Sequence, residues 1–408
     1  MRRNVVVLAV AVALAVALVA PAQAEFIAKH GNGWLERQQN LLVLHVEGTP
    51  RDMGRQQGVL LKEQIAAVVK GVTKDAAALA KEAGIPEGAL EPALDTIWGH
   101  LSANVPADLQ EEIAGVAEGA GIDVKVLQHM CAAVEAGEIM RTCSSFCAWG
   151  KATAGGKMYQ IRNLDYSTDI GLQDNCILLV AKPQGKFKFV APSYAGFVGC
   201  VSGINEKGIA LGEIGAGASE AERNFGGMPM PIMLRQILET CDNAQRAADI
   251  VKSASRTAGF NYIFGDPDHQ TVRACETSSK YFAVYTDNDP AEKAAEGNMA
   301  MENAVMRADG VADAKRIAEA KHQNLAQDDR YQKMGQMIKA AYGKINADEA
   351  IKISQAVAMT GNLHCVVYNN SDREIWVANA IGAKRAADSP YLHFKLADLF
   401  AAQPPAGS

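Results

Sequence analysis

The sequence predicts an α+β protein in which a helical N-terminal region precedes two β-sheets packed face to face, with helices on their outer sides. Alanine, lysine, glutamate and leucine dominate residues 49–139, where apolar residues recur at spacings of three and four, as in amphipathic helices. From Cys143 onward the pattern changes to short apolar or alternating windows separated by glycine-containing turns, which indicates strands. Strands, a helix pair, strands, a second helix pair and strands follow one another, and this order predicts two packed sheets with helices outside them.

The N-terminus has the three parts of a secretory signal peptide. Arg2 and Arg3 are followed by an apolar run over residues 5–19 and by an Ala-Gln-Ala motif before Glu25, so residues 1–24 are interpreted as the leader. The run is shorter than the roughly 20 residues that span a bilayer, and no later segment is longer or as apolar. We therefore expect a soluble protein, secreted or periplasmic, with no stable membrane span.

Charge and cysteine content narrow the classes of function. Loss of the two leader arginines changes the formal charge from −6 to −8, which argues against a nucleic-acid partner. The eight cysteines are scattered through a long chain, unlike those of a disulfide scaffold, and the sequence leaves open which of them pair. Hydrophobic residues make up 49% of the chain, enough for a substantial core.

Local patterns place the elements in order. Residues 41–47 (LLVLHVE) predict a strand, Gly54 and Gly58 mark the start of the helical region, and residues 25–142 are interpreted as a helical pro-segment. The next strands are predicted at residues 145–149, 158–161, 176–181, 187–191, 199–204 and 209–213. Helices at residues 231–240 and 243–254 precede strands at residues 261–264, 271–275 and 281–285. Residues 290–327 give no clear pattern, and the chain continues with helices at 330–341 and 347–359 and strands at 364–368 and 374–378.

Common catalytic and cofactor motifs are absent from the sequence. It contains no His-Glu-x-x-His, Cys-x-x-Cys, Gly-x-Ser-x-Gly or Ser-x-x-Lys, so metal and serine-hydrolase chemistry lose their usual support. The glycines of residues 212–217 depart from the dinucleotide-binding spacing. We predict no metal site and no cofactor.

The region around Cys143, in contrast, contains candidate catalytic residues. The strand that begins there is joined by a glycine turn to a second strand containing Arg162 and Asp165, and a hairpin would bring the two segments together. Residues three apart on a strand face opposite sides unless a bulge intervenes. The alternative interpretation of this Arg and Asp is a surface ion pair of little energetic value.

The stretch CSSFCAWGKATAGGKMYQIRNLDY resembles the N-terminal nucleophile hydrolases of the choloylglycine-hydrolase group. It is most similar to the peptidase C45, or acyl-coenzyme A:6-aminopenicillanic acid acyltransferase-like, branch. The resemblance runs from LLVLHVEGTPRDMGRQQG through GINEKGIAL to the terminal strands and weakens beyond Glu276. It implies a four-layer αββα sandwich over residues 143–408. It also implies a precursor that cuts itself before a cysteine, leaving a small and a large chain that remain associated.

The resemblance assigns a role to each matching residue. Cleavage between Thr142 and Cys143 would free an amine that serves as the base for the thiol of the same residue; a free thiol has a pKa near about 8.5 and an α-amine about 7.7–8.0. Asp165 would orient this residue, and Arg162 would favour the thiolate. Asn261 would donate to the oxyanion. None of the eight histidines lies beside these motifs in the sequence.

Three assignments have alternatives. Cys147 is a rival nucleophile, which a small buried thiol would equally explain. A backbone N–H of residues 212–213 would be the second oxyanion donor, although Glu213 stands where the resemblance implies asparagine or glycine. Arg330 resembles a substrate-binding arginine of bile-salt-type relatives, and an arginine on a helix surface is the commoner explanation.

The expected function is that of an exported, self-cleaving cysteine hydrolase or acyltransferase. It would cleave a linear amide bond in a small N-acyl substrate through a thioester on Cys143. The alternative is a non-catalytic periplasmic module that binds small molecules on the same fold. An ester hydrolase of the same superfamily would differ in substrate only.

Overall fold

The computed structural model describes residues 24–86, 88–137, 142–215, 223–287, 289–290, 293, 297–308 and 329–407. The predicted signal peptide lies outside these ranges except for Ala24, as does the segment 138–141 that precedes the predicted cleavage site.

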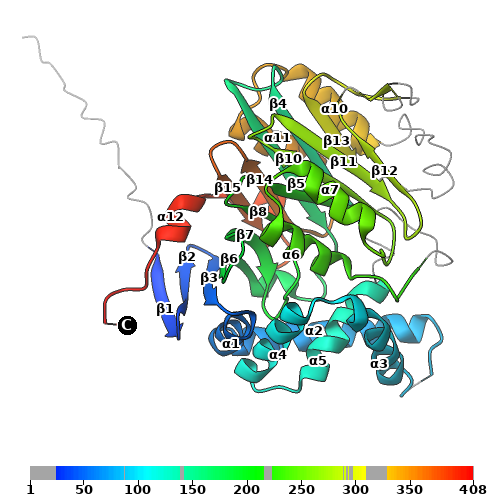
Figure 1. Ribbon diagram of the computed structural model, residues 1–408, viewed down its shortest axis with the longest axis vertical. Coiled ribbons are helices and arrows are strands. Elements are labelled where there is room, and N and C mark those ends of the chain that lie inside the picture. The colour runs from blue at the N-terminus through cyan, green and yellow to red at the C-terminus, as the bar shows by residue number, and fades with distance from the viewer. Residues whose placement is uncertain are drawn as a thin grey trace, which may run out of the picture.

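Two sheets form the centre of the protein (Figure 1). The ten strands of sheet A lie in the order β1-β2-β3-β6-β7-β8-β9-β10-β11-β12, and the six of sheet B in the order β13-β4-β5-β14-β15-β16. Sheet A comprises β1 (Glu25–His30), β2 (Gly33–Gln38), β3 (Leu41–Gly48), β6 (Cys176–Pro183), β7 (Phe189–Tyr194), β8 (Ser202–Asn205), β9 (Ala210–Gly215), β10 (Phe260–Asp266), β11 (Thr271–Thr277) and β12 (Phe282–Tyr285). Sheet B comprises β4 (Thr142–Gly150), β5 (Gly156–Asp165), β13 (Ala304–Ala308), β14 (Asn362–Asn369), β15 (Glu374–Asn379) and β16 (Leu392–Lys395).

Helices cover the outer face of each sheet, which confirms the predicted four-layer αββα arrangement. Helices α6 (Met230–Thr240) and α7 (Ala244–Ser253) pack on sheet A, and α10 (Asp329–Ala340) and α11 (Ala347–Val357) pack on sheet B. Between the sheets, Val366 and Tyr368 of β14 share an apolar cluster with Leu178 and Val180 of β6. Alternation along the central strands β5, β10 and β14, which are buried over most of their length, turns successive side chains to opposite faces of the sheet.

The N-terminal region contains five helices, which gather at the lower end of the molecule in Figure 1. They are α1 (Pro50–Leu60), α2 (Lys62–Glu82), α3 (Leu90–Leu101), α4 (Ala107–Ala120) and α5 (Val124–Gly137). β3 corresponds to the strand predicted at residues 41–47, whereas β1 and β2 before it were not predicted; all three extend sheet A. β3 runs parallel to β6, with Leu42 opposite Ile177. The predicted pro-segment therefore shares a sheet with the catalytic region.

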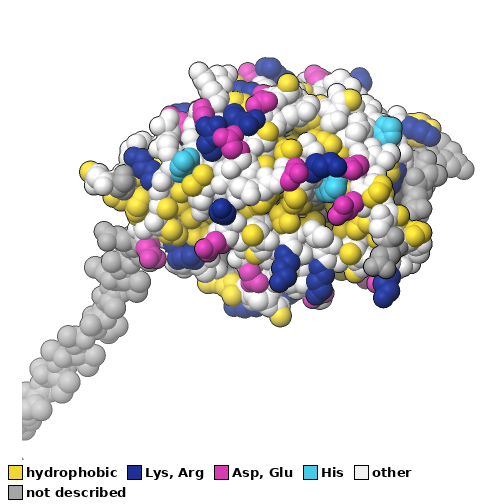
Figure 2. Space-filling model, turned by 90° about the horizontal axis from the view of Figure 1, so that it is seen from below, with side chains coloured by type: hydrophobic (Ala, Val, Ile, Leu, Met, Phe, Trp, Pro, Cys, Tyr) yellow, Lys and Arg dark blue, Asp and Glu magenta, His cyan; other side chains and the backbone are white. Residues whose placement is uncertain are grey.

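Glycines allow α1 and α4 to cross at very short range. A Cβ at Gly58 would lie 2.3 Å from the carbonyl oxygen of Val116, and one at Gly115 would lie 2.3 Å from that of Arg51. Gly54 and Gly58 thus lie inside α1 as a packing surface. Figure 2 shows the molecule from below, where acidic and basic side chains lie next to one another across the surface; the exposed Arg51–Glu118 ion pair of α1 and α4, at 2.9 Å, is of this kind.

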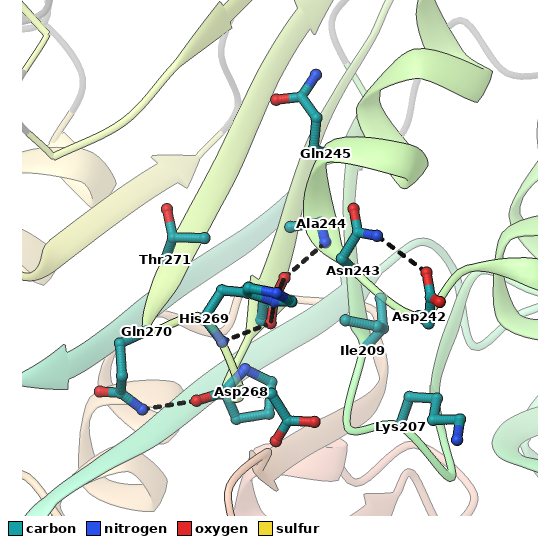
Figure 3. A network of polar contacts seen from close by, with 12 residues as sticks. Lys207, Ile209, Asp242, Asn243, Ala244, Gln245, Asp268, His269, Gln270 and Thr271 are labelled. Carbon is teal, nitrogen blue, oxygen red and sulfur yellow. Dashed lines mark hydrogen bonds and ion pairs between the residues drawn. The ribbon is translucent and has the colours of Figure 1, made fainter.

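A network of hydrogen bonds joins α7 to the turn between β10 and β11 (Figure 3). The buried Asp266 carboxylate accepts a hydrogen bond from the Ala244 N–H at the start of the helix and another from the His269 N–H, both 3.0 Å long. Asn243 caps the same helix by accepting from the Arg246 N–H at 2.8 Å. The bonds from Ala244 and Arg246 satisfy N–H groups of the first turn of α7 that have no partner within the helix.

Several short elements were not predicted from the sequence. These are β13, β16, the terminal helix α12 (Leu396–Ala401) and the 3-10 turns Ser102–Asn104, Leu172–Asn175 and Ala386–Asp388. None of the eight cysteines forms a disulfide. In the part of the chain that the structure describes, no helix combines the length and apolar character needed to cross a membrane.

Candidate active site

Cys143 is the second residue of β4 and lies opposite Leu164 of β5. The hairpin between these strands turns through Gly155 and Gly156, both with positive φ, a conformation that glycine adopts at little cost. Its register sets Ser145 opposite Arg162. The predicted hairpin therefore brings the cysteine and the arginine segments side by side.

The Arg162 guanidinium, fully buried, lies against the thiol. Its Nη2 atom is 3.4 Å from Cys143 Sγ and 2.7 Å from a carboxylate oxygen of Glu213, and its Nε donates to the Glu213 carbonyl oxygen at 3.3 Å. Burial disfavours the charge, yet Cys143 and Glu213 together raise the pKa of Arg162. The side chain is thus a permanent cation held against the sulfur.

The environment of the Cys143 thiol favours its protonated form. Burial raises the pKa of Cys143 to about 12; Arg162 opposes this rise, whereas Glu213 and Asp165 add to it. The backbone N–H of Asp165 also favours the thiolate. Because one adjacent cation does not offset burial, formation of the thiolate requires a base within reach of the sulfur.

Asp165 lies on the other face of β5, as the three-residue spacing predicted. Arg330 Nη2 contacts one carboxylate oxygen at 2.5 Å, and Asn362 Nδ2 donates to the other at 2.8 Å. Burial raises the pKa of Asp165 although Arg330 opposes that rise. The interpretation of Arg330 as a surface residue was wrong: its side chain is 12% exposed and also donates to Ser144 Oγ at 3.1 Å. Arg162 and Asp165 are both buried and lie on opposite faces of β5, so they do not form a surface ion pair with each other.

Asn261 approaches from sheet A. It alternates on β10 to the same face as Ile263, which packs against Cys147 of sheet B. On β9, which pairs with β10, a Cβ at Gly212 would lie 2.2 Å from Ser145 Oγ. The two sheets are therefore in close contact here, and the side chain of Asn261 lies on the face that looks toward Cys143 and its strand.

Cys147, the rival nucleophile, has a different environment. It is buried with Trp149, Met158 and Ile263, and burial alone raises its pKa well above the ordinary value. Cys143 has a cation against its sulfur, so the geometry favours Cys143 as the reactive thiol.

Two site residues were missed in the sequence. The Glu213 side chain, and not only its backbone, reaches Arg162. His364 of β14 lies 3.3 Å from Arg162 Nη1, so a histidine does adjoin the site in space. Both fall in predicted strands, but the sequence carries no signal for which strand lies opposite β5.

An apolar cavity of about 70 Å³ adjoins the hairpin. Leu164, the cross-strand partner of Cys143, contributes to its wall with residues from both halves of the chain. The wall consists of Val68, Val72, Met130, Val134, Leu164, Tyr166, Leu172, Tyr194, Phe197, Val201 and Leu363. Among the described residues of this wall, the polar side-chain groups are the two tyrosine hydroxyls. Among the described residues, no group of three or more histidine, cysteine or acidic side chains is arranged to hold a metal ion.

Comparisons with known proteins give one family and several distant relatives. The chain is 25% identical over 389 residues to Protein dcd1A of Dictyostelium discoideum, covering 88% of this chain and 83% of that protein. It is 26% identical over 286 residues to an uncharacterized protein of Archaeoglobus fulgidus, covering 64% of this chain and 46% of that protein.

Solved structures align less closely. A Caenorhabditis elegans ortholog of N-acylethanolamine-hydrolyzing acid amidase aligns with 16% identity and a TM-score of 0.43, covering 56% of this chain and 93% of that chain. Penicillin V acylase from Agrobacterium tumefaciens aligns with 10% identity and a TM-score of 0.41, covering 62% and 86%.

The profile of one protein family matches residues 152–383, which is more than half of the chain. The match begins after Cys143, so it does not include the proposed nucleophile. The chain belongs to the acyl-coenzyme A:6-aminopenicillanic acid acyl-transferase family, a branch of the N-terminal nucleophile hydrolases.

Proposed function

We propose that the protein is an exported amide hydrolase or acyltransferase whose nucleophile is Cys143, freed by self-cleavage after Thr142. The observation that carries the proposal is the contact of Arg162 Nη2 with Cys143 Sγ at 3.4 Å in a chain of this family. Self-cleavage would convert the backbone nitrogen of Cys143 into a free α-amine, which can serve as the base for the thiol of the same residue.

The reaction proceeds in two acyl transfers. The α-amine of Cys143 takes the thiol proton, and the sulfur attacks the substrate carbonyl to give a tetrahedral oxyanion. Asn261 would donate to that oxygen, together with a backbone N–H of residues 212–213. The C–N bond then breaks, the departing amine takes the proton from the α-amine, and a thioester remains. Water or an acceptor amine attacks the thioester, returns its proton to the sulfur and releases the acyl product.

The cavity beside Leu164 supports an N-acyl substrate with an apolar acyl group. None of the described residues of its wall has a charged side chain, and a buried ionic group without a partner would be strongly disfavoured there. The volume of about 70 Å³ is less than half of the roughly 150 Å³ that accommodates benzene in an engineered cavity. We therefore expect the cavity to favour a short, unbranched acyl chain over a branched or aromatic one.

The contacts between the two halves favour chains that stay associated after cleavage. Besides the β3–β6 pairing, Arg235 of α6 bonds Glu112 of α4 at 2.9 Å and Glu239 at 2.7 Å, and all three are buried. Lys186 contacts Glu239 at 2.6 Å and also Asp108 of α4. Separation of the chains would break the Arg235–Glu112 and Lys186–Asp108 ion pairs, and breaking a buried ion pair is costly.

Self-cleavage is tested by intact-mass analysis and N-terminal sequencing of the purified protein. We expect one chain that starts Glu25 and another that starts Cys143-Ser144-Ser145. Cys143→Ala should remain in one piece and be inactive, whereas the matched control Cys147→Ala should be cleaved and active. An intact chain with full activity, or an active Cys143→Ala, contradicts the proposal. Cell fractionation tests export, and a protein that keeps its leader in the cytoplasm would contradict that part.

A binding module on the same fold is the second candidate. Thiol-directed acyl probes separate the two: labelling of Cys143 at neutral pH supports the enzyme. A Cys143 that resists the probe while the protein binds hexanoyl amides supports the binding module.

A further inference from the structure

We infer that His364 is a positioning residue that directs the Arg162 guanidinium toward Cys143 and links it to the apolar cavity through Tyr194. The ring is fully buried. Its Nε2 atom lies 3.3 Å from Arg162 Nη1 and 2.8 Å from Ser202 Oγ, and its Nδ1 atom lies 3.2 Å from the Tyr194 hydroxyl. The inference rests on the proposed function, in which Arg162 acts on the nucleophile.

A β-bulge aims His364 at this position. The pairing of β14 with β5 shifts between Asn362, which lies opposite Asp165, and His364, which lies opposite Leu164. The extra residue is Leu363. Regular alternation would send Leu363 and His364 to opposite faces, whereas Leu363 here lines the cavity and His364 contacts the guanidinium on the same side of the sheet. Bulges re-aim side chains in this way and are frequent beside active sites.

The hydrogen-bond partners of the His364 ring determine which of its nitrogens carries the proton. A guanidinium only donates hydrogen bonds, so Nε2 carries no proton, and its single lone pair is shared between Arg162 Nη1 and the Ser202 hydroxyl. The proton of the neutral ring is then on Nδ1, from which it is donated to the Tyr194 oxygen. Burial and the nearby charge of Arg162 lower the pKa of His364 well below its ordinary value, so the ring stays neutral beside the cation. Tyr194 is part of the cavity wall, and a continuous hydrogen-bonded chain therefore joins cavity and guanidinium.

This arrangement gives the guanidinium a fixed direction. Glu213 holds one edge of Arg162, and His364 holds the other. With both anchors in place, Nη2 points at the sulfur of Cys143. Removing His364 allows the guanidinium to rotate about its bond to Glu213, which moves the positive charge away from the sulfur and weakens its support of the thiolate.

The test is the pH dependence with which iodoacetamide alkylates Cys143, followed by peptide mass spectrometry. His364→Phe keeps a ring but removes both nitrogens, His364→Gln keeps one acceptor, and the matched control His45→Phe alters a buried histidine of β3. We expect His364→Phe to raise the pH of half-maximal alkylation by about one unit, a tenfold loss of thiolate at a given pH. His364→Gln should raise it less, and His45→Phe should leave it unchanged.

If His364 had a purely structural role, its replacement would lower the pH of half-maximal alkylation, because a loosened core would expose the Cys143 thiol and speed its alkylation. An unshifted or lowered midpoint in a His364→Phe protein that melts cooperatively overturns the inference. If that protein does not fold, His364→Gln and Tyr194→Phe carry the test with the same readout. Hydrolysis of hexanoyl p-nitroanilide by Cys143→Ala would instead overturn the proposed function, so the two failures are distinguishable.

Discussion

Replacement of Glu213 by glutamine is expected to make Cys143 more acidic and more reactive. The Glu213 oxygen and the Cys143 sulfur lie 2.7 and 3.4 Å from the same nitrogen of Arg162, so they are at most about 6 Å apart. Glutamine keeps an oxygen that accepts from Arg162 and removes only the negative charge. The perturbation therefore separates charge from packing.

The size of the effect follows from that separation. Two unit charges about 6 Å apart interact by roughly 2.8 kcal/mol at an effective dielectric constant of about 20, which is about two pKa units. Glu213 raises the pKa of Cys143, so its neutralisation should lower that pKa by about this amount. The thiolate fraction then rises about a hundredfold below both pKa values. Because a less basic thiolate is less nucleophilic, with a Brønsted coefficient of about 0.4–0.5, alkylation should be roughly tenfold faster.

The assay is the rate of iodoacetamide alkylation of Cys143 across a pH series, together with a thermal melt. Glu112→Gln is the matched control, since Glu112 is also buried and bonded to an arginine, Arg235, at 2.9 Å. Its alkylation profile should match that of the wild type. A folded Glu213→Gln protein with an unchanged or slower rate would refute the reasoning and show that the carboxylate does not act on the sulfur.

Three further predictions concern stability. Arg330→Met should destabilise the protein by about 3–5 kcal/mol in urea unfolding at pH 7, because it leaves the buried Asp165 carboxylate without its cation; a loss below about 1 kcal/mol would contradict this. Gly115→Ala should lower stability by about 1–3 kcal/mol, since its Cβ would lie 2.3 Å from a carbonyl oxygen of α1. The same change at Gly99, which has open space around it, should raise stability by about 0.5–1 kcal/mol, and equal effects in thermal melts would refute the close contact. Burial raises the pKa of Glu112 to about 7, so the folded state binds a proton that the unfolded state releases, and stability should fall as the pH rises from about 4.5 to about 7. Glu112→Gln should lack this fall, and a wild-type unfolding free energy that is flat over that window would contradict the assignment.

The layers and the hairpin could be predicted from the sequence because their signals are local. The switch from a period of 3.6 to a period of two at Cys143 marks where the helical region ends and β4 begins. Glycines with positive φ at residues 155–156 form the turn that sets Arg162 beside the cysteine strand. The opposite orientation of Asp165 follows from the same alternation. β1 and β2 were missed although their Gly-Asn-Gly turn was visible, because β1 alternates only between exposed and half-buried residues and β2 buries only its first three residues.

The remaining site residues were decided by tertiary structure alone. Glu213 comes from β9, Arg330 from the start of α10 and His364 from a bulge in β14, all far along the chain from Cys143. Periodicity records which face of a strand is buried, but it does not record which strand lies opposite, and a one-residue register shift reverses the facing of all that follows. The sequence by itself therefore determined the strand that contains Cys143 and the layers around it. Only the packing of two sheets and a helix end around Arg162 and Asp165 decided which charges surround them.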